Sequence, residues 1–454
     1  MRYDARAPTA LGSLQGLMSA ISTVVDTPRF GVSGHAGTVH APVARMGSFV
    51  HSQRQIGLAA VSAFCNDFRM SSGRRARRAG LAVLGAVGLL LAVSCTGAQE
   101  DAPGPGSGSG SAGAGVESVL GSPGGPPTID QVESAVRERI TLLRGVFPGV
   151  IALVRVGDQT RTVAVGLADT KAGTAMSAVD TFPVASISKT MVATAVMQQV
   201  EAGTLTLDDT VEQWLPGLVV QGDRMTVGQL LSHRSGIHDL HEDLLSDSER
   251  QPPDTLTDHE IVRLAGAQSP DFPPGSDGSY SSTGYVVLGM ILEKAAGAPL
   301  REVLATRLWE PAGMDDTVMA PKRWDVHGYN DEKDVTADSW LNVGQAAGGV
   351  VGTAADVDRF FQHLWAGDLL DPGTVAVMTR PTETSPFGYG RYGLGVWIVD
   401  TTCGKALGHS GSAPGYVIQA WTLKGEDRSV VVMVNDGDEY DTAQDIADTA
   451  LCSP

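Results

Sequence analysis

Basic residues are scarce in this chain of 454 residues: Lys and Arg total 33, against 51 Asp and Glu, for a formal net charge of −18. The shortage is uneven, because residues 1–95 hold 10 Arg, no Lys and 3 Asp, whereas the remainder holds 23 basic and 48 acidic residues. An acidic body of this kind argues against nucleic acid as a partner. The composition is otherwise that of a globular protein, with 42% hydrophobic and 19% charged residues.

The apolar run from Ala79 to Val93 is too short for a membrane span. It suits the core of a signal peptide, and the positive stretch Arg74–Arg78 precedes it. The run ends in AVSC, which resembles a bacterial lipobox, and this implies cleavage before Cys95 and lipid attachment to its thiol. We therefore expect residues 70–95 to be a lipoprotein signal that anchors the protein by this lipid to the outer face of the bacterial cytoplasmic membrane. A plain secretory signal, with Cys95 incidental and the protein secreted, is the alternative.

Residues 1–69 lack a clear repeat, a helical period or a motif. Signal peptides begin at an N-terminus, so we expect that translation starts at Met70. Residues 1–69 would then result from a mis-called start codon and be unstructured. An internal signal-anchor helix is the alternative. Residues 96–128 are dominated by Gly, Ser and Pro and predict a flexible tether. The pattern of a folded domain covers residues 129–454.

Strand patterns occur at both ends of this domain and helical patterns lie between them. After a predicted helix over 129–143, two runs rich in β-branched residues predict a hairpin over 149–169. Short helical segments and Gly/Pro loops fill residues 204–395. Strands return in GLGVWIV, YVIQAWTL and SVVVMVND, and EYDTAQDIADTALC predicts a last helix. The order predicts an α+β fold with one antiparallel sheet built from both chain ends, flanked by helices, and a mostly helical insertion.

A lysine stands in an apolar stripe of the helix predicted over residues 185–203. The stripe comprises Val192, Ala193, Val196, Met197 and Val200. Lys189 lies within it, and Ser186 lies one turn earlier on nearly the same face. A buried lysine that shares or loses its proton is a base, and serine needs a base to become a nucleophile. Ser-x-x-Lys is therefore a sensible catalytic pair, although a lysine that reaches solvent from the stripe edge explains the helix equally well.

Two further motifs decide between these interpretations. Tyr280-Ser281-Ser282 lies on a loop that runs into an apolar helix, and His409-Ser410-Gly411 lies at the head of a strand. The three motifs, in this order and spacing, resemble those of the serine β-lactamase and penicillin-binding hydrolase family, in the branch of class C β-lactamases and serine D-alanyl-D-alanine carboxypeptidases. Further segments that support the resemblance are LLSHRSGIHDL (230–240), PAGMDDT (311–317), AAGGVVGTAADVDRF (346–360) and YGLGV (392–396). The resemblance covers 129–454 and implies a β-lactamase-like fold.

The resemblance also implies roles for the matching residues. Ser186 would attack a carbonyl and form an acyl-enzyme, while Lys189 and Tyr280 handle the proton. The backbone N–H groups of Ser186 and Ser412 would form an oxyanion hole, and Ser410 and Gly411 would line the substrate strand. His409 would lie beside the leaving group, to orient the substrate or assist proton transfer. No cofactor or metal is required, and we expect a monomer that acts on a small peptide, β-lactam or ester.

Two departures from the family pattern concern the substrate. The family usually has Asn where Ser282 stands, and a serine hydroxyl cannot both donate and accept at the reach of an amide. The related carboxypeptidases carry an arginine on the strand before His-x-Gly, where this sequence has Trp397 or a neighbour. Arg391 and Lys405 are the nearby cations that could replace it. We expect D-alanyl-D-alanine carboxypeptidase activity with weak discrimination for a free carboxylate.

A disulfide between Cys403 and Cys452 is expected from the compartment and the family fold. Export would leave these two cysteines in an oxidising environment, apart from the lipidated one. Cys403 precedes the strand of His409, and Cys452 ends the last helix. In the family this helix packs across the sheet, so that the pair can meet.

Other functions fit the sequence less well. GHSGS at 408–412 fails the Gly-x-Ser-x-Gly pattern of α/β-hydrolases at its last position, and a strand follows it. The group His233, His238, Asp239, His241 and Glu242 matches no standard zinc spacing, and we expect a solvated loop there. Within the family, a class C-like β-lactamase or an esterase is the alternative enzyme. A sensor that acylates with a β-lactam and barely turns over is the alternative without catalysis.

Overall fold

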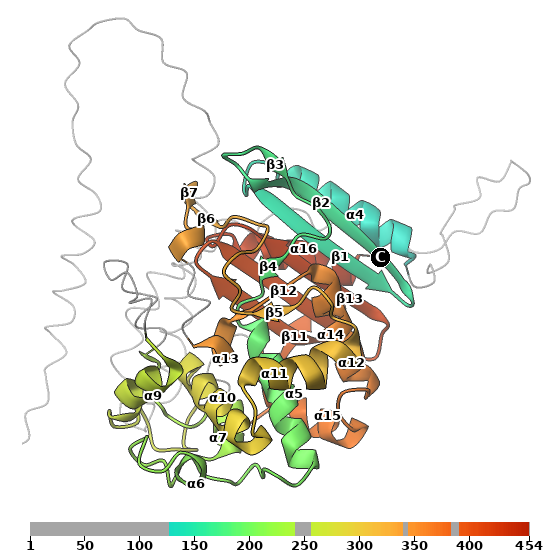
Figure 1. Cartoon of the computed structure of the whole chain (residues 1–454). Coiled ribbons are helices and arrows are strands. Elements are labelled where there is room, and N and C mark those ends of the chain that lie inside the picture. Colours follow the sequence, from blue (N-terminus) through green and yellow to red (C-terminus); the bar gives the residue numbers. More distant parts are fainter. Residues whose placement is uncertain (1–126, 241–255, 339–343, 383–389, 454) are drawn as a thin grey trace, which may run out of the picture. The chain divides into compact units, whose positions relative to one another are not determined.

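The computed structural model describes residues 127–240, 256–338, 344–382 and 390–453. Its main sheet is antiparallel, in the order β3-β2-β1-β13-β12-β11-β10-β9 (Figure 1). The strands are β1 (Gly149–Val156), β2 (Gln159–Asp169), β3 (Thr174–Ala175), β9 (Arg391–Tyr392), β10 (Trp397–Thr401), β11 (Gly404–Ala413), β12 (Tyr416–Leu423) and β13 (Arg428–Val434). The predictions for residues 1–126, including the lipidation of Cys95, and those for His241 and Glu242 lie outside the described residues.

Strands from the two ends of the domain meet in the middle of the sheet. β1 pairs with β13 over its length, from Val150 opposite Val434 to Val156 opposite Arg428. The predicted hairpin is present as β1 and β2, with Val156 opposite Gln159 across a two-residue turn. The α+β fold with a sheet made from both ends is therefore confirmed.

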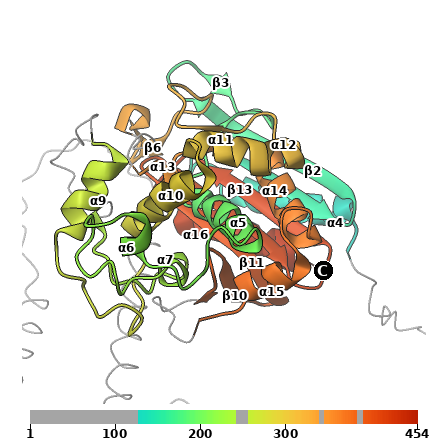
Figure 2. The ribbon, with the colours of Figure 1, turned by 60° about the horizontal axis from the view of Figure 1, so that its bottom comes forward.

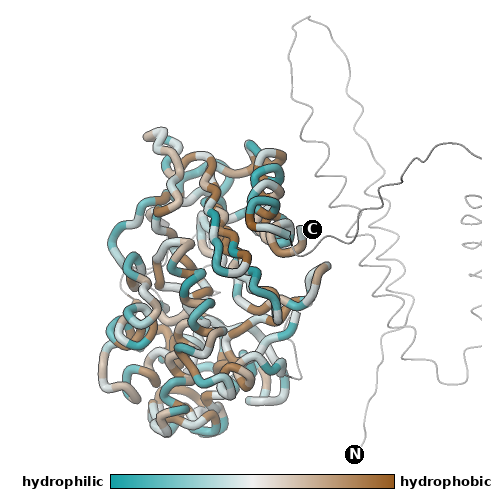
Figure 3. The backbone as a smooth tube through the Cα atoms, turned by 90° about the vertical axis from the view of Figure 1, so that its right-hand side faces the viewer, coloured by the Kyte–Doolittle hydropathy of each residue, from teal (hydrophilic) through white to brown (hydrophobic). Residues whose placement is uncertain are grey.

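Alternate residues of the central strands face two different hydrophobic clusters, as the pleat of a strand requires. Val150, Ala152 and Val154 pack with helices α4 (Ile129–Leu142) and α16 (Tyr440–Cys452). Ile151 and Leu153 pack on the opposite side with α5 (Ile187–Glu201) and α14 (Ala354–Ala366). In α4 the apolar positions recur every three or four residues, and its other side is polar (Figure 3). A sheet covered on both faces explains why these strands are apolar throughout.

The middle of the chain supplies most of the helices, as expected. They are α6 (Val211–Trp214), α7 (Val227–Leu231), α9 (Asp258–Gly266), α10 (Ser282–Ala296), α11 (Leu300–Leu304), a π-turn (Ala305–Trp309), α12 (Glu310–Ala312), α13 (Gln345–Gly348) and α15 (Pro372–Met378). Of these, α10, α11 and α13 pack beside α5 (Figure 2). Short strands β4 (Phe182–Pro183), β5 (Val318–Met319) and β8 (Val350–Gly352) form a small sheet, and β6 (Tyr329–Asn330) pairs with β7 (Lys333–Asp334). Within the described residues, no helix is long and apolar enough to span a membrane.

Helix α5 has no exposed face over most of its length, contrary to the expectation of an apolar stripe. Its buried residues run without interruption from Ile187 to Met197. The sheet covers one side and α10, α11 and α13 cover the other. Lys189 is 1% exposed and therefore does not reach solvent from a stripe edge. This observation removes the alternative that the sequence left open.

The strand that carries His409 also differs from the expectation. His409 lies in the second half of β11, and the chain reverses after Ala413 into β12. The prediction that this motif lies at the head of a strand is therefore wrong, because Pro414-Gly415 forms the turn between β11 and β12. The predicted disulfide between Cys403 and Cys452 is confirmed, and it joins the β10–β11 turn to the end of α16.

Candidate active site

Ser186 occupies the N-terminus of α5, next to a left-handed residue. Ser186 is the residue before the helix proper, and it is partly exposed in a largely buried segment. Ala185 has a φ of 47°, a conformation that costs a non-glycine residue roughly 1–2 kcal/mol. Strain of this kind collects at functional sites and requires support from the surrounding structure. Here the left-handed Ala185 turns the chain from β4 into α5. Ser186 is left partly exposed at the otherwise buried start of the helix.

Lys189 lies beside this hydroxyl, as Ser-x-x-Lys predicts. Its ammonium nitrogen Nζ is 3.0 Å from Ser186 Oγ and donates to the carbonyl of Ala347 over 2.8 Å. Ala347 belongs to α13, in the segment AAGGVVGTAADVDRF. Since burial of an ammonium without partners is costly, these contacts hold Lys189 in a defined position. The structure therefore brings the predicted nucleophile and base within hydrogen-bond reach.

Tyr280 lies on the loop before α10 and faces the same lysine. Lys189 Nζ is 4.8 Å from the centre of the Tyr280 ring. The ring of His233 stacks on Tyr280 with centroids 4.2 Å apart. The three predicted residues Ser186, Lys189 and Tyr280 are thus brought together, although 94 residues separate the first from the last. Their catalytic roles remain predictions that the geometry allows.

Strand β11 approaches the start of α5 at a glycine. A Cβ on Gly411 would lie 2.5 Å from the carbonyl oxygen of Val184 and 3.3 Å from the amide nitrogen of Ser186. No side chain fits there, so glycine allows β11 to approach the backbone of Ser186. Ala413 and Tyr416 face each other across the hairpin turn, so by alternation Ser412 directs its backbone groups away from β12. This arrangement allows the expected oxyanion hole of the Ser186 and Ser412 amides.

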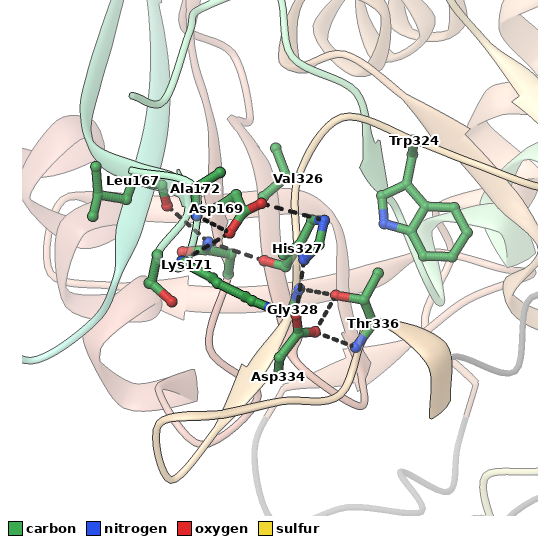
Figure 4. A network of polar contacts seen from close by, with 12 residues as sticks. Leu167, Asp169, Lys171, Ala172, Trp324, Val326, His327, Gly328, Asp334 and Thr336 are labelled. Atoms are coloured by element: carbon green, nitrogen blue, oxygen red, sulfur yellow. Dashed lines mark hydrogen bonds and ion pairs between the residues drawn. The ribbon is translucent and has the colours of Figure 1, made fainter. Parts of the chain in front are cut away.

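The turn after Ser412 is held by polar contacts of Tyr416 with the neighbouring loop. Tyr416 accepts a hydrogen bond from Trp324 Nε1 over 2.8 Å and donates to the carbonyl of Val326 over 2.9 Å. His327 lies between Asp169 and Asp334 in Figure 4, and its Nδ1 is 2.8 Å from the Asp334 carboxylate. These contacts connect the β11–β12 hairpin to β2 through the loop that contains His327.

His409 is buried, and protein groups engage both of its ring nitrogens. Nδ1 contacts the carbonyl of Ser410, so it must carry a proton and donate. Nε2 lies 3.0 Å from the hydroxyl of Tyr392. Burial, together with the charge of Lys189, lowers the pKa of His409 to about 3. A neutral His409 held in this way is suited to orient the strand, and its contact with the leaving group stays a prediction.

Ser282 is the first residue of α10 and is 5% exposed. Its amide donates to Asp239 over 2.9 Å, and the amide of Thr283 donates to the same carboxylate over 3.0 Å. A carboxylate at a helix N-terminus satisfies free amides and interacts well with the helix dipole. The segment after Tyr280 is therefore fixed by Asp239. Ser282 adjoins the site, and its role toward the substrate stays a prediction.

The histidine group that the sequence predicted as a solvated loop is different in the structure. His233 is 1% exposed, and Asp239 binds the start of α10, so the prediction is wrong for these two residues. His238 lies 3.2 Å from Asp271. In the described part of the chain, no group of three or more His, Cys, Asp or Glu residues is placed to hold a metal. The sequence LLSHRSGIHDL does not indicate a role for His233, because a histidine in a predicted loop gives no signal of burial.

The two candidate cations for a substrate carboxylate both lie near Asp400. Lys405 forms an ion pair with Asp400, and Lys405, with a smaller contribution from Arg391, lowers the pKa of that carboxyl. Arg391 is exposed at the edge strand β9, opposite Ile398. Lys405 precedes His409 by four residues on one extended strand, which places the two roughly 13 Å apart. Trp397 is buried, with its ring against Tyr392 and 6.3 Å from His409.

Comparison with known protein families identifies the chain. The family model described as Beta-lactamase matches residues 129–452. Because this match covers more than half of the sequence, the chain belongs to the Beta-lactamase family, and it is a serine hydrolase of that family.

Individual relatives agree with this assignment. The chain is 27% identical to "Penicillin-binding protein 4*" of Bacillus subtilis (strain 168) over 296 residues, which are 60% of this chain and 64% of the relative. It is 30% identical to "Penicillin-binding protein 4" of Amycolatopsis lactamdurans over 315 residues, or 64% and 81% of the two chains. The match therefore spans less than two thirds of the Bacillus relative. Among solved structures, D-amino acid amidase from Ochrobactrum anthropi SV3 is similar with a TM-score of 0.63 and 25% identity, over 71% of this chain and 97% of that one.

Proposed function

We propose that this protein hydrolyses peptide bonds between D-amino acids by a covalent acyl-enzyme on Ser186, as a D-alanyl-D-alanine carboxypeptidase of the penicillin-binding type. The observation that carries the proposal is the Lys189 Nζ to Ser186 Oγ distance of 3.0 Å, with the Tyr280 ring beside the same nitrogen. A buried lysine within reach of a serine hydroxyl is the arrangement that activates a weak nucleophile.

The proposed reaction has two halves. Ser186 Oγ attacks the scissile carbonyl, and its proton passes to Lys189 and Tyr280. The negative charge on the carbonyl oxygen is met by the amides of Ser186 and Ser412. The tetrahedral intermediate expels the terminal amine, which takes the proton. Water then attacks the ester by the reverse proton path and releases the acid.

Two observations bear on the substrate. The likeness to proteins named penicillin-binding supports a D-alanyl-D-alanine peptide, for which penicillin is a structural analogue. A second candidate, hydrolysis of D-amino acid amides, is favoured by the placement of Arg391 and Lys405 beside Asp400 and by the likeness to D-amino acid amidase. An amide has no terminal carboxylate for a cation to bind. A class C-like β-lactamase, an esterase and a non-turnover sensor share the same acylation step.

The proposal includes export, with a lipid on Cys95 or simple secretion, and a monomeric state. The Cys403–Cys452 disulfide supports an oxidising compartment, because such bonds are rare in the cytosol. Mass spectrometry of the native membrane fraction tests the anchor: we expect an N-terminal diacylglyceryl-cysteine at Cys95. Native peptides from residues 1–69 would contradict the start at Met70.

A substrate panel tests the function. The purified full chain is compared with Ser186→Ala on a D-Ala-D-Ala peptide, a D-amino acid amide, nitrocefin and a short-chain p-nitrophenyl ester. We expect turnover of the peptide and labelling of Ser186 by a fluorescent penicillin, both lost in Ser186→Ala. Labelling without turnover of any substrate would establish the sensor instead. Labelling of another serine in Ser186→Ala would show that the assigned nucleophile is wrong.

A further inference from the structure

His233 contacts Tyr280 itself and the residues on either side of it. The carbonyl of His233 accepts from the amide of Ser279 over 3.0 Å. Its ring nitrogen Nδ1 accepts from the amide of Ser281 over 3.1 Å. Its ring stacks on the Tyr280 ring at 4.2 Å with an angle of 32° between the planes. The backbone on both sides of Tyr280 and the face of its ring are therefore fixed by one histidine.

The conformation of His233 is unfavourable by itself and serves these contacts. Its φ is 58°, in the left-handed region that non-glycine residues occupy infrequently. The ring is buried among Tyr280, Tyr285 and Tyr392, and Nε2 has no hydrogen-bond partner among the described residues. A buried polar atom without a partner costs roughly 1–3 kcal/mol. An apolar side chain would fill this buried site without that cost. We therefore infer that the histidine is present for its acceptor Nδ1.

This geometry requires the neutral form of His233. The Ser281 amide is a donor, so Nδ1 must present a lone pair and the proton must lie on Nε2. Burial, Lys189 and His409 lower the pKa of His233 well below its usual value, in agreement with this tautomer. Because the His233 ring is neutral, it adds no second positive charge next to Tyr280, and Lys189 is the cation that acts on the tyrosine.

We propose that His233 is the positioning residue for Tyr280, which holds the tyrosine toward Lys189 through the neutral acceptor Nδ1, the backbone carbonyl and the stacked ring. The proposal rests on the function proposed above, because it assumes that Tyr280 moves the Ser186 proton. His233 itself touches neither the nucleophile nor, in this arrangement, the substrate. It acts through Tyr280 alone, and this separates it from a catalytic base.

Substitutions can separate the Nδ1 acceptor from the rest of the side chain. His233→Asn keeps an acceptor, because Oδ1 corresponds in position to Nδ1, and Asn tolerates positive φ. His233→Leu removes the acceptor and keeps apolar bulk, while His233→Gln moves the polar group one bond further out. His363→Leu is the matched control, since this histidine lies in α14 and contacts Asp368. We measure the rate constant for acylation by a fluorescent penicillin and the midpoint of thermal unfolding.

We expect His233→Leu and His233→Gln to slow acylation by about 100-fold, the scale of a misplaced acid or base. His233→Asn should recover the rate to within about tenfold of wild type, and His363→Leu should leave it unchanged. A purely structural role predicts losses that follow thermal stability and no rescue by Asn, and that result overturns the proposal. Should His233→Leu fail to fold, His233→Gln and His233→Asn still give the comparison.

A double-mutant cycle with Tyr280→Phe isolates the mechanism. If His233 acts through Tyr280, the variant with both Tyr280→Phe and His233→Gln acylates no more slowly than Tyr280→Phe. Full additivity of the two losses overturns the proposal while Ser186 remains the labelled residue. Labelling that persists in Ser186→Ala instead overturns the proposed function, so the two failures are distinguishable.

Discussion

Tyr392 holds His409 by a hydrogen bond of 3.0 Å between its hydroxyl and Nε2 of the imidazole. Burial and the neighbouring Tyr285 and Tyr280 raise the pKa of Tyr392 well above 10, so the hydroxyl keeps its proton and donates. Nε2 of His409 is therefore the acceptor, and Nδ1 carries the proton and donates a hydrogen bond to the Ser410 carbonyl. A residue in the YGLGV segment thus sets the tautomer of the histidine in the third motif.

Tyr392→Phe removes this donor and leaves Nε2 of His409 buried without its partner. We expect a loss of about 1–3 kcal/mol in the free energy of unfolding, because an unsatisfied buried acceptor is costly. Acylation by a fluorescent penicillin should slow as well, since β11 carries Ser412. Urea titration and stopped-flow fluorescence measure the two effects. Tyr440→Phe is the comparison, because it removes the Tyr440 hydroxyl that donates a hydrogen bond to Ser410 Oγ on the same strand. Unchanged stability in Tyr392→Phe would contradict the argument.

Lys189→Ala removes the base proposed for Ser186. We expect acylation to fall by roughly 10²–10⁴-fold, the contribution of a positioned general base. Lys424→Ala is the matched control, because Lys424 is exposed after β12, and its rate should equal that of wild type. The measurement is the rate of covalent labelling at saturating fluorescent penicillin. Wild-type labelling in Lys189→Ala would exclude Lys189 as the activating residue.

Neutral burial of His409 predicts a loss of stability in mild acid. Its pKa is lowered to about 3 in the folded state, so between pH 6.5 and 3 the unfolded chain binds a proton that the folded chain does not. Stability must then fall as the pH falls through this range, by up to about 1.4 kcal/mol per pH unit for one proton. Asp258 and Asp436 act in the opposite direction, because burial raises the pKa of each to about 6.

A variant isolates the histidine from these carboxyls. Urea unfolding of wild type and His409→Asn at pH 7, 6, 5 and 4 should show a steeper loss in the wild type, since the contributions of Asp258 and Asp436 cancel in the difference. Parallel pH dependence of wild type and His409→Asn would mean that His409 titrates normally in the folded protein.

The sequence predicted the parts of the fold that depend on local pattern. The hairpin of β1 and β2 follows from two runs rich in β-branched residues, the last helix follows from its helical pattern, and the meeting of both chain ends in one sheet follows from the order of these elements. The surroundings of α5 could not be predicted this way, because burial on all sides depends on which helices pack there. By contrast, Ser186 and Lys189 could be predicted, because their spacing along one helix is a local feature.

Residues that act through distant contacts gave no such signal. His233 and Tyr280 stack although they are far apart in the chain, and the bond between Ser281 and His233 depends on a left-handed residue that no spacing indicates. The placement of Arg391 and Lys405 beside Asp400 was likewise not predictable, since it depends on the register of β9 and β11 with β10. Register across a sheet is set by the whole fold.

The placement of these cations predicts the specificity of the enzyme. A carboxypeptidase binds a free terminal carboxylate, for which a bidentate arginine is the usual partner. Lys405 is engaged by Asp400, and Arg391 is exposed near the same carboxylate, so we expect neither to select the free acid strongly. A matched pair of peptides, one with a terminal carboxylate and one with a terminal amide, should therefore differ little in kcat/KM. Arg391→Ala and Lys405→Ala should leave the ratio unchanged. A preference for the acid above about 100-fold, near 2.7 kcal/mol at 1.36 kcal/mol per decade, would require a cationic clamp and would contradict this prediction.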